Sequence, residues 1–221
     1  MLSAPLPQRA KKLLDFWFGA AGDPDRERHR EIWFKSNEAF DQSVRETFLA
    51  DYEAAAAGRL SAWEESAEGA LALVLLLDQV PRNIFRDTPR AYATDAAARA
   101  VADRALARGL DRDVPPVWRR FLYMPFHHSE DLADQRRSVA LFDTVMRSSD
   151  REGSLRRYGH SYVEVIERFG RFPHRNAILG RPSTPEEVAF MAQAKARSSK
   201  PPAGERGPGD PVPATRLDQS A

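Results

Sequence analysis

The chain carries apolar residues at helical spacing, broken at intervals by glycine and proline. The clearest stripe repeats every four residues, at Phe40, Val44, Phe48 and Tyr52. It predicts one long helix with a single buried face, ending near Gly58. A similar stripe from Leu155 to Phe169 predicts an amphipathic helix near the C-terminus. No segment sustains the two-residue alternation of a strand, so the pattern predicts an all-α fold of antiparallel helices.

Prolines and capping residues mark the expected helix boundaries. The run 71–77 is apolar all round and predicts a buried, central helix. Pro81 should end that helix near Gln79 or Val80 and leave residues 82–86 as a turn, and Pro125 should likewise leave residues 126–128 as a loop. Asp23-Pro24 predicts a short charged helix reaching residue 34, and Asp95 should cap another. Thr184 and Glu187 have the spacing of a capping box.

Composition bounds the domain organisation. The 221 residues are 42% hydrophobic, which is enough for one sizeable core. Residues 198–221 hold five prolines and three glycines but only Val212 and Leu217 as large aliphatics. We therefore predict a single helical domain over residues 1–197 and a disordered tail over residues 198–221.

Charge and cysteine content exclude several classes of protein. The formal net charge is +1, which provides no general attraction for nucleic acid or an anionic membrane. The longest apolar run, residues 70–77, is too short to span a bilayer. The absence of cysteine rules out disulfides and thiolate chemistry and fits a cytoplasmic location. We predict neither a nucleic-acid nor a membrane partner, and a protein partner stays open.

Two proline-broken segments concentrate polar residues among aromatic ones. The first is Asp78-Gln-Val-Pro-Arg-Asn-Ile-Phe-Arg86, and the second is Arg168-Phe-Gly-Arg-Phe-Pro-His-Arg-Asn-Ala-Ile-Leu-Gly-Arg181. Each follows a helical pattern and carries an Arg-Asn pair beside phenylalanine. We expect the two segments to pack against each other and form one site.

These segments, together with Phe16-Trp-Phe-Gly19, Trp33-Phe34 and His128-Ser-Glu-Asp131, stand in an order that resembles the bacterial family catalogued as domain of unknown function 924. The resemblance covers about residues 14–191. It implies a tetratricopeptide-like stack of helices and no particular activity. His127 departs from the pattern, at a position where an apolar residue such as methionine is expected.

Four interpretations of the polar residues remain open. The arginines and carboxylates could pair only with each other and hold the fold. They could instead leave a cationic pocket for a small anionic metabolite. The ligand-binding candidates are Arg82, Asn83, Arg86, Arg168, Arg171, Arg175 and Asn176.

The other two interpretations concern catalysis and protein binding. Histidines and carboxylates could form a hydrolase-type acid–base site, with or without a metal. The candidates are His128, Glu130, His160 and His174, with Glu164 one helical turn beyond His160. No complete metal-binding motif is present, and no cofactor is indicated. A tetratricopeptide-like stack could also bind peptides in a groove.

Overall fold

The protein is all-helical, as predicted. The computed structural model describes residues 5–33, 37–146 and 153–198, and within them the regular structure is helical throughout. The side chains of residues 146, 153–160 and 197–198 are not part of this description. The helices are α1 (Gln8–Phe18), α2 (Glu38–Ala56), α3 (Ala67–Val74), α4 (Val80–Ile84), α5 (Asp95–Ala107), α6 (Pro116–His127), α7 (Leu132–Met146), α8 (Gly153–Phe169) and α9 (Pro185–Ser198). The tail predicted from residue 198 lies outside the described residues from position 199 onward.

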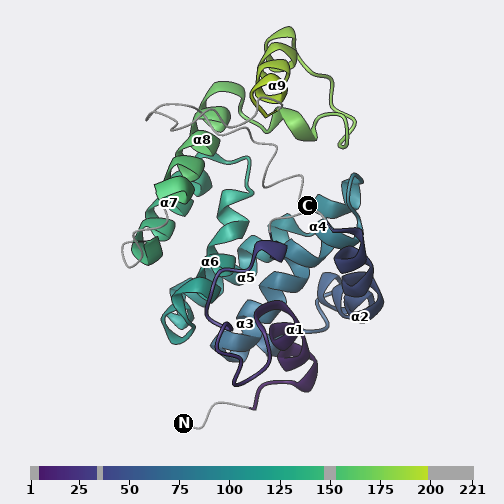
Figure 1. Ribbon diagram of the computed structural model, residues 1–221, viewed down its shortest axis with the longest axis vertical. Helices are drawn as coiled ribbons and strands as arrows, with labels where there is room; N and C mark the ends of the chain where they lie inside the picture. Colours follow the sequence, from purple (N-terminus) through teal and green to yellow (C-terminus); the bar gives the residue numbers. More distant parts are fainter. Residues whose placement is uncertain (1–4, 34–36, 147–152, 199–221) are drawn as a thin grey trace.

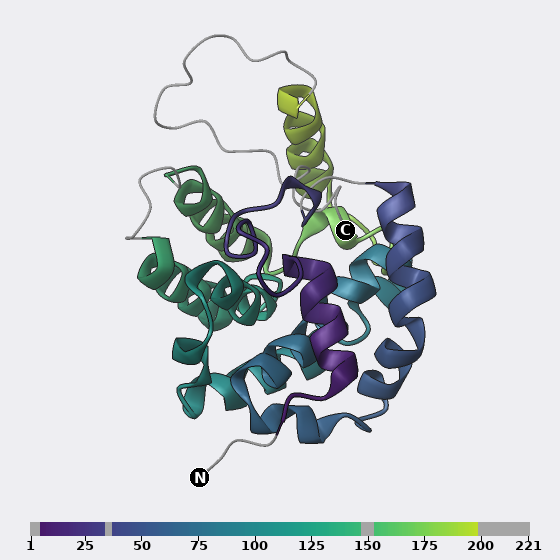
Figure 2. The same ribbon diagram turned by 60° about the horizontal axis from the view of Figure 1, so that its bottom comes forward.

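The main core surrounds α3 and the turn that follows it. Every residue from Ala70 to Val80 is buried, which confirms the buried helix expected from its apolar run. Helix α1 lies beside α2 and packs on α3 (Figure 2). Where α1 meets α6, the Phe18 and Trp118 rings stack at 4.4 Å and Phe121 meets Phe18 edge-on. Aromatic burial therefore joins the N-terminal helix to the middle of the chain.

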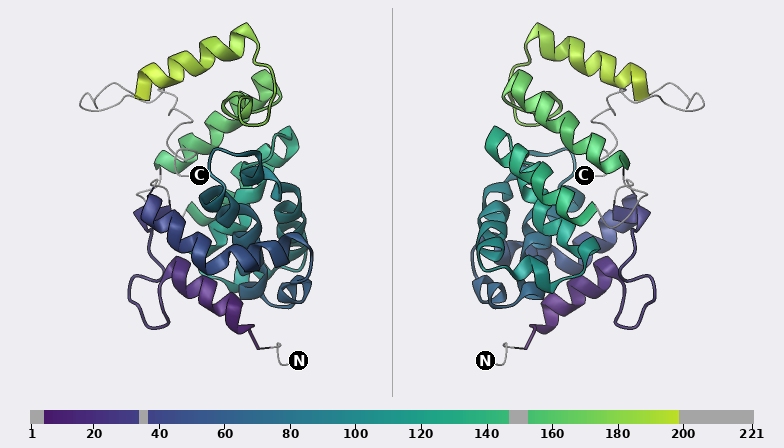
Figure 3. Two further views of the ribbon diagram at one scale, coloured as in Figure 1. Left: turned by 90° about the vertical axis from the view of Figure 1, so that its right-hand side faces the viewer. Right: turned by 90° about the vertical axis from the view of Figure 1, so that its left-hand side faces the viewer.

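A smaller apolar cluster lies toward the C-terminus. Its buried members are Tyr162, Val165, Ile166 and Phe172. Helix α9 stands at the end of the molecule opposite α1, beyond α7 and α8 (Figures 1 and 3). The predicted capping box at its start is confirmed, because Thr184 Oγ1 accepts from the Glu187 N–H at 3.2 Å and a Glu187 oxygen accepts from the Thr184 N–H at 2.7 Å.

The boundary predicted at Pro81 is wrong. A π turn, Leu75–Gln79, follows α3, and α4 then continues through Pro81. Proline cannot donate to the carbonyl of Leu77, four residues earlier, and that oxygen instead accepts from Thr94 Oγ1 at 2.6 Å. A hydroxyl from a distant segment thus satisfies the group that Pro81 leaves unpaired, and the helix need not end.

Three other local predictions are also wrong. Helix α6 continues past Pro125 to His127, because Phe126 and His127 are buried in the core rather than exposed in a loop. Asp95 lies in the first turn of α5 but does not cap it, since its carboxylate binds Arg82.

The third concerns residues 24–34, of which the structure describes residues 24–33, so that Phe34 lies outside the described residues. In place of a charged helix, the chain forms turns and one short 3-10 turn, Glu31–Trp33. Arg30 and the Trp33 indole both donate to the carbonyl of Trp17, at 2.9 and 2.8 Å. These contacts to α1 hold the segment in a non-helical path.

Candidate functional site

Arg82 binds two buried carboxylates. Its guanidinium forms a fork on Asp95, with Nη1–Oδ1 at 2.8 Å and Nη2–Oδ2 at 3.0 Å. Nη1 also donates to the main-chain oxygen of Asp78 at 2.6 Å and lies 3.2 Å from its carboxylate. Only 3% of Arg82 is exposed, so this predicted ligand-binding residue is occupied by the protein itself.

Asp78 lies on the π turn and is fully buried. Its Oδ1 is 2.8 Å from His128 Nδ1, and its Oδ2 accepts from the Gln79 amide. Burial alone would raise the pKa of Asp78, but the interactions with His128, Arg82 and the Gln79 amide outweigh it, so the pKa lies well below its usual range. Asp78 is therefore an ionised acceptor that orients the His128 ring. π turns often occur at functional sites.

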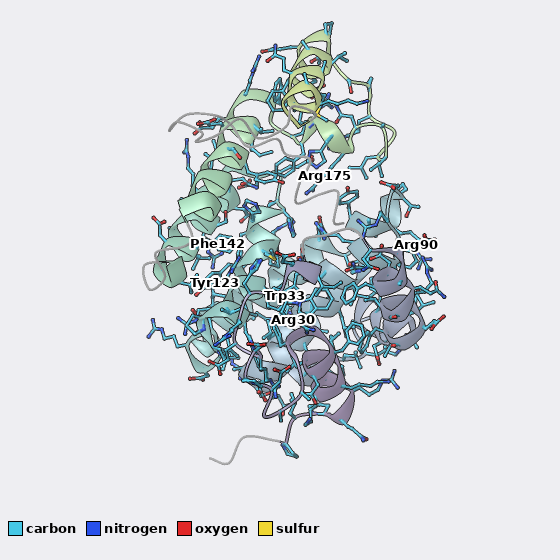
Figure 4. The ribbon with its side chains drawn as sticks, in the orientation of Figure 1. Arg30, Trp33, Arg90, Tyr123, Phe142 and Arg175 are labelled. Atoms are coloured by element: carbon cyan, nitrogen blue, oxygen red, sulfur yellow. The ribbon has the colours of Figure 1, made fainter. Side chains whose placement is uncertain are left out.

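His128 lines a cavity of about 550 Å³. The cavity lies between α5, the start of α7 and the second polar segment, residues 168–181, which is called the C-terminal segment below. Its wall includes Tyr92, Asp95, Arg99, Glu130 and Arg175. Figure 4 shows Arg175 extending from the C-terminal segment toward the rest of the chain. The volume suits a small metabolite.

Arg175 differs from the other arginines of the two segments. Nη1 donates to the His128 main-chain oxygen at 3.0 Å and lies 3.8 Å from Asp95. The guanidinium lies 4.7 Å from the Tyr92 ring centre and 4.5 Å from that of Phe172. Its Nε is buried without a hydrogen-bond partner, and Nη2 makes no hydrogen bond to the described residues. Arg175 is thus 96% buried with one donor edge unused.

The remaining predicted arginines and asparagines have protein partners. Arg86 and Asn83 both bind Asp41 of α2, at 2.7 Å each. Arg168 binds Glu186, and Arg171 places a fork on Glu187 at 2.7 and 2.9 Å. Asn176 donates to Ser183 and Glu187 and accepts from Arg181.

Glu130 belongs to the same paired set. It accepts from the Phe172 N–H at 2.8 Å and from both terminal nitrogens of Arg181, at 2.6 and 2.9 Å. Burial would raise the pKa of Glu130, but the hydrogen bonds from Arg181 and Phe172 lower it more. Its carboxylate joins the loop before α7 to the C-terminal segment and is not free to act as a base.

Glu187 holds the start of α9 to the C-terminal loop. The Arg171 hydrogen bond, followed by that from the Thr184 N–H, lowers the pKa of Glu187 to about 2. The stabilising contacts of the Glu187 carboxylate are present above its unfolded-state pKa and are lost as pH falls toward 2.

We expect hydrogen exchange of the first α9 amides to accelerate, beyond the intrinsic pH effect, between pH 4.5 and 2.5. In Glu187→Gln that acid-dependent component should be absent, and equal profiles for the two proteins would contradict the assignment.

The predicted histidines are not all at the cavity. His128 lines it, whereas His174 is not among the lining residues and its ring lies 5.4 Å from that of Phe172. His160 lies on α8, but its side chain is outside those described. Among the described residues, no group of three histidine, aspartate or glutamate side chains could hold a metal ion. His127 occupies an apolar site, 4.3 Å from the Tyr162 ring, as its unusual position suggested.

Residues 92–95 link the two polar segments, residues 78–86 and 168–181. Arg82 and Arg175 both lie near Asp95 and face the Tyr92 ring, at 5.5 and 4.7 Å. Sequence reasoning missed Tyr92 and Arg99 as cavity residues and Asp41 as the partner of Arg86. The sequence signal that could have identified Tyr92 as a cavity residue is its position three residues before Asp95. Arg99 follows Asp95 by one helical turn.

These features define an all-helical protein with a buried Asp-Arg-His network beside a small cavity. The sequence model of the family described as "Bacterial protein of unknown function (DUF924)" matches residues 13–195, and the chain belongs to this family. It is similar to the solved structure of a protein of unknown function, ATU0120, from Agrobacterium tumefaciens. The two are 42% identical with a TM-score of 0.73, over 83% of this chain and 97% of that one. No curated protein matches the chain.

Proposed function

We propose that the cavity binds a small anionic metabolite and that Arg175 is its principal contact. The observation that carries the proposal is the unused Nε–Nη2 edge of Arg175, in a residue that is 96% buried. Burying a guanidinium without satisfying its donors is costly, and a bound carboxylate or phosphate would supply the missing acceptors.

Three other arginines of the two segments support an oxyanion as the partner of that edge. Arg86, Arg168 and Arg171 each place Nε and Nη2 on a carboxylate, those of Asp41, Glu186 and Glu187 respectively. Arg175 has the same edge without a carboxylate from the described residues. A ligand oxyanion would complete the same planar fork.

The carboxylates around the cavity do not supply this missing partner. Asp95 is held by Arg82, Glu130 by Arg181, and Asp131 accepts from the Ala133 and Asp134 N–H groups at the start of α7. Arg99, which also lines the cavity, lies 3.3 Å from Asp134 and keeps 28% of its side chain exposed. Arg99 is therefore placed to supply a second positive charge.

The test compares two arginine variants. At about ten times its dissociation constant, an anion such as citrate or sulfate should raise the melting temperature of the wild type by about 3–6 °C. In Arg175→Ala the anion should bind about 10- to 100-fold more weakly, because a charged fork is lost. Arg168→Ala removes the same charge at an exposed pair and should respond like the wild type, which controls for general salt effects. Equal responses in all three proteins would overturn the proposal.

Other expectations remain proposals. No helix among the described residues is long and apolar enough to cross a membrane. The cytoplasmic location, the single domain over residues 1–197, the tetratricopeptide-like stacking and a protein partner stay predictions.

A further inference from the structure

We infer that anion binding in the cavity is coupled to the uptake of one proton by His128, whose Nε2–H becomes a second donor to the bound anion. This inference rests on the proposed anion site and names how that site is controlled. It also narrows the ligand to oxyanions with at least two acceptor oxygens, one for Arg175 and one for His128.

The first step is the orientation of the imidazole. Asp78 is fully buried, and its Oδ1 lies 2.8 Å from His128 Nδ1. An ionised carboxylate only accepts hydrogen bonds, so Nδ1 carries a proton in both the neutral and the charged ring. The second nitrogen, Nε2, makes no hydrogen bond to the described residues, and the ring lines the cavity. Gain or loss of a proton at His128 therefore happens at Nε2.

The second step is the proximity of His128 to Arg175. The main-chain oxygen of His128 accepts from Arg175 Nη1 at 3.0 Å. His128 and Arg175 also line the same cavity, so an anion that Arg175 holds there would share that space with the His128 ring. A neutral ring would present a lone pair to that anion and repel it, whereas a protonated ring would donate to it. The anion and the proton each favour the binding of the other.

The other charged groups around His128 are compatible with protonation of its ring. Its carboxylate neighbours are Asp78 on the π turn, Asp95 on α5, and Glu130 and Asp131 before α7. Its cationic neighbours are Arg82 on α4, Arg99 on α5 and Arg175 in the C-terminal segment. The His127 ring, on α6, lies 5.9 Å away. The carboxylates around the ring offset the arginines, so an incoming proton does not enter a purely cationic environment.

The arrangement also has a chemical consequence. A group that passes a proton to an oxygen of a bound ligand can act as a general acid, and an orienting carboxylate behind it fixes its geometry. The same side chain would therefore be the proton donor of any reaction carried out on that oxyanion.

Sulfate is the probe for the experiment, because it stays dianionic between pH 6 and 8. We expect its affinity for the wild type to fall about 10-fold over this range, in which histidines titrate. Calorimetry at pH 7.5 in two buffers of different ionisation enthalpy should show net proton uptake. His128→Gln should bind sulfate with an affinity that does not change with pH, and His29→Gln, at an exposed position, should behave like the wild type.

The outcomes separate the two proposals. Absence of sulfate binding at both pH values would contradict the anion site itself. Equal binding at both values without proton uptake would leave the site intact and overturn the coupling to His128. Should His128→Gln fail to fold, nitrogen NMR of ¹⁵N-histidine-labelled wild type decides: sulfate at pH 7.5 must shift His128 Nε2 toward its protonated value, and an unchanged signal overturns the inference.

Discussion

Arg82→Ala should lower the free energy of unfolding by about 3–5 kcal/mol, because it removes the guanidinium that Asp95 and Asp78 share in the buried network. Asp78 is fully buried and Asp95 is 9% exposed, and Arg82 is the fork that joins them. After the substitution Asp78 would keep His128 and Gln79, while Asp95 would keep only the 3.8 Å approach of Arg175. Urea denaturation followed by circular dichroism measures the change.

The matched control is Arg86→Ala. Arg86 also binds one carboxylate, Asp41, but 19% of its side chain and 17% of that of Asp41 are exposed, so water can replace the lost contacts. We expect a loss of about 1 kcal/mol there. A loss below about 1 kcal/mol in Arg82→Ala itself would show that Arg82 is not a structural residue and would return it to the set of ligand contacts.

Gly69→Ala should destabilise the protein by about 3 kcal/mol, although alanine normally favours a helix over glycine by about 1 kcal/mol. Gly69 lies in the first turn of α3, and an added Cβ would come within 2.1 Å of the main-chain oxygen of Trp63. It would also approach Ser66 Oγ, at 2.9 Å, which caps the helix by accepting from the Gly69 N–H. Backbone atoms cannot rotate away as a side chain can, so α3 or the preceding turn must shift.

The control is Glu68→Ala at the neighbouring position. Because glutamate and alanine both have high helix propensity, this substitution should change the free energy of unfolding by no more than about 0.5 kcal/mol. Thermal melts of both variants give the comparison. A Gly69→Ala protein at least as stable as the wild type would mean that α3 does not pack on the Trp63 turn as described.

Patterns in the sequence predicted a structural feature correctly where the interactions that form it lie within a few residues of each other. The stripe from Phe40 to Tyr52 gave α2, and the spacing of Thr184 and Glu187 gave the capping box of α9. The break expected at Pro81 did not occur, because the hydroxyl that satisfies Leu77 comes from Thr94, seventeen positions after it. A one-dimensional pattern does not contain that partner.

The same limit applies to the candidate site. Arg82-Asn83 and Arg175-Asn176 look alike in the sequence, and nothing local tells which guanidinium is paired. The difference lies in carboxylates from other elements, since Asp95 takes the fork of Arg82 while the free edge of Arg175 has no such partner among the described residues. The sequence predicted the type of chemistry, and only the tertiary structure separates the paired arginines from the candidate contact.

The most direct measurement of the central claim is the Nε–H resonance of Arg175 in ¹⁵N-arginine-labelled protein during a sulfate titration at pH 6. An anion on the unused edge should shift this signal in a saturable way, while the Nε–H signals of Arg86 and Arg171, already paired with Asp41 and Glu187, stay in place. If the Arg175 signal does not move, or if all three move together in proportion to salt, the cavity is not an anion site.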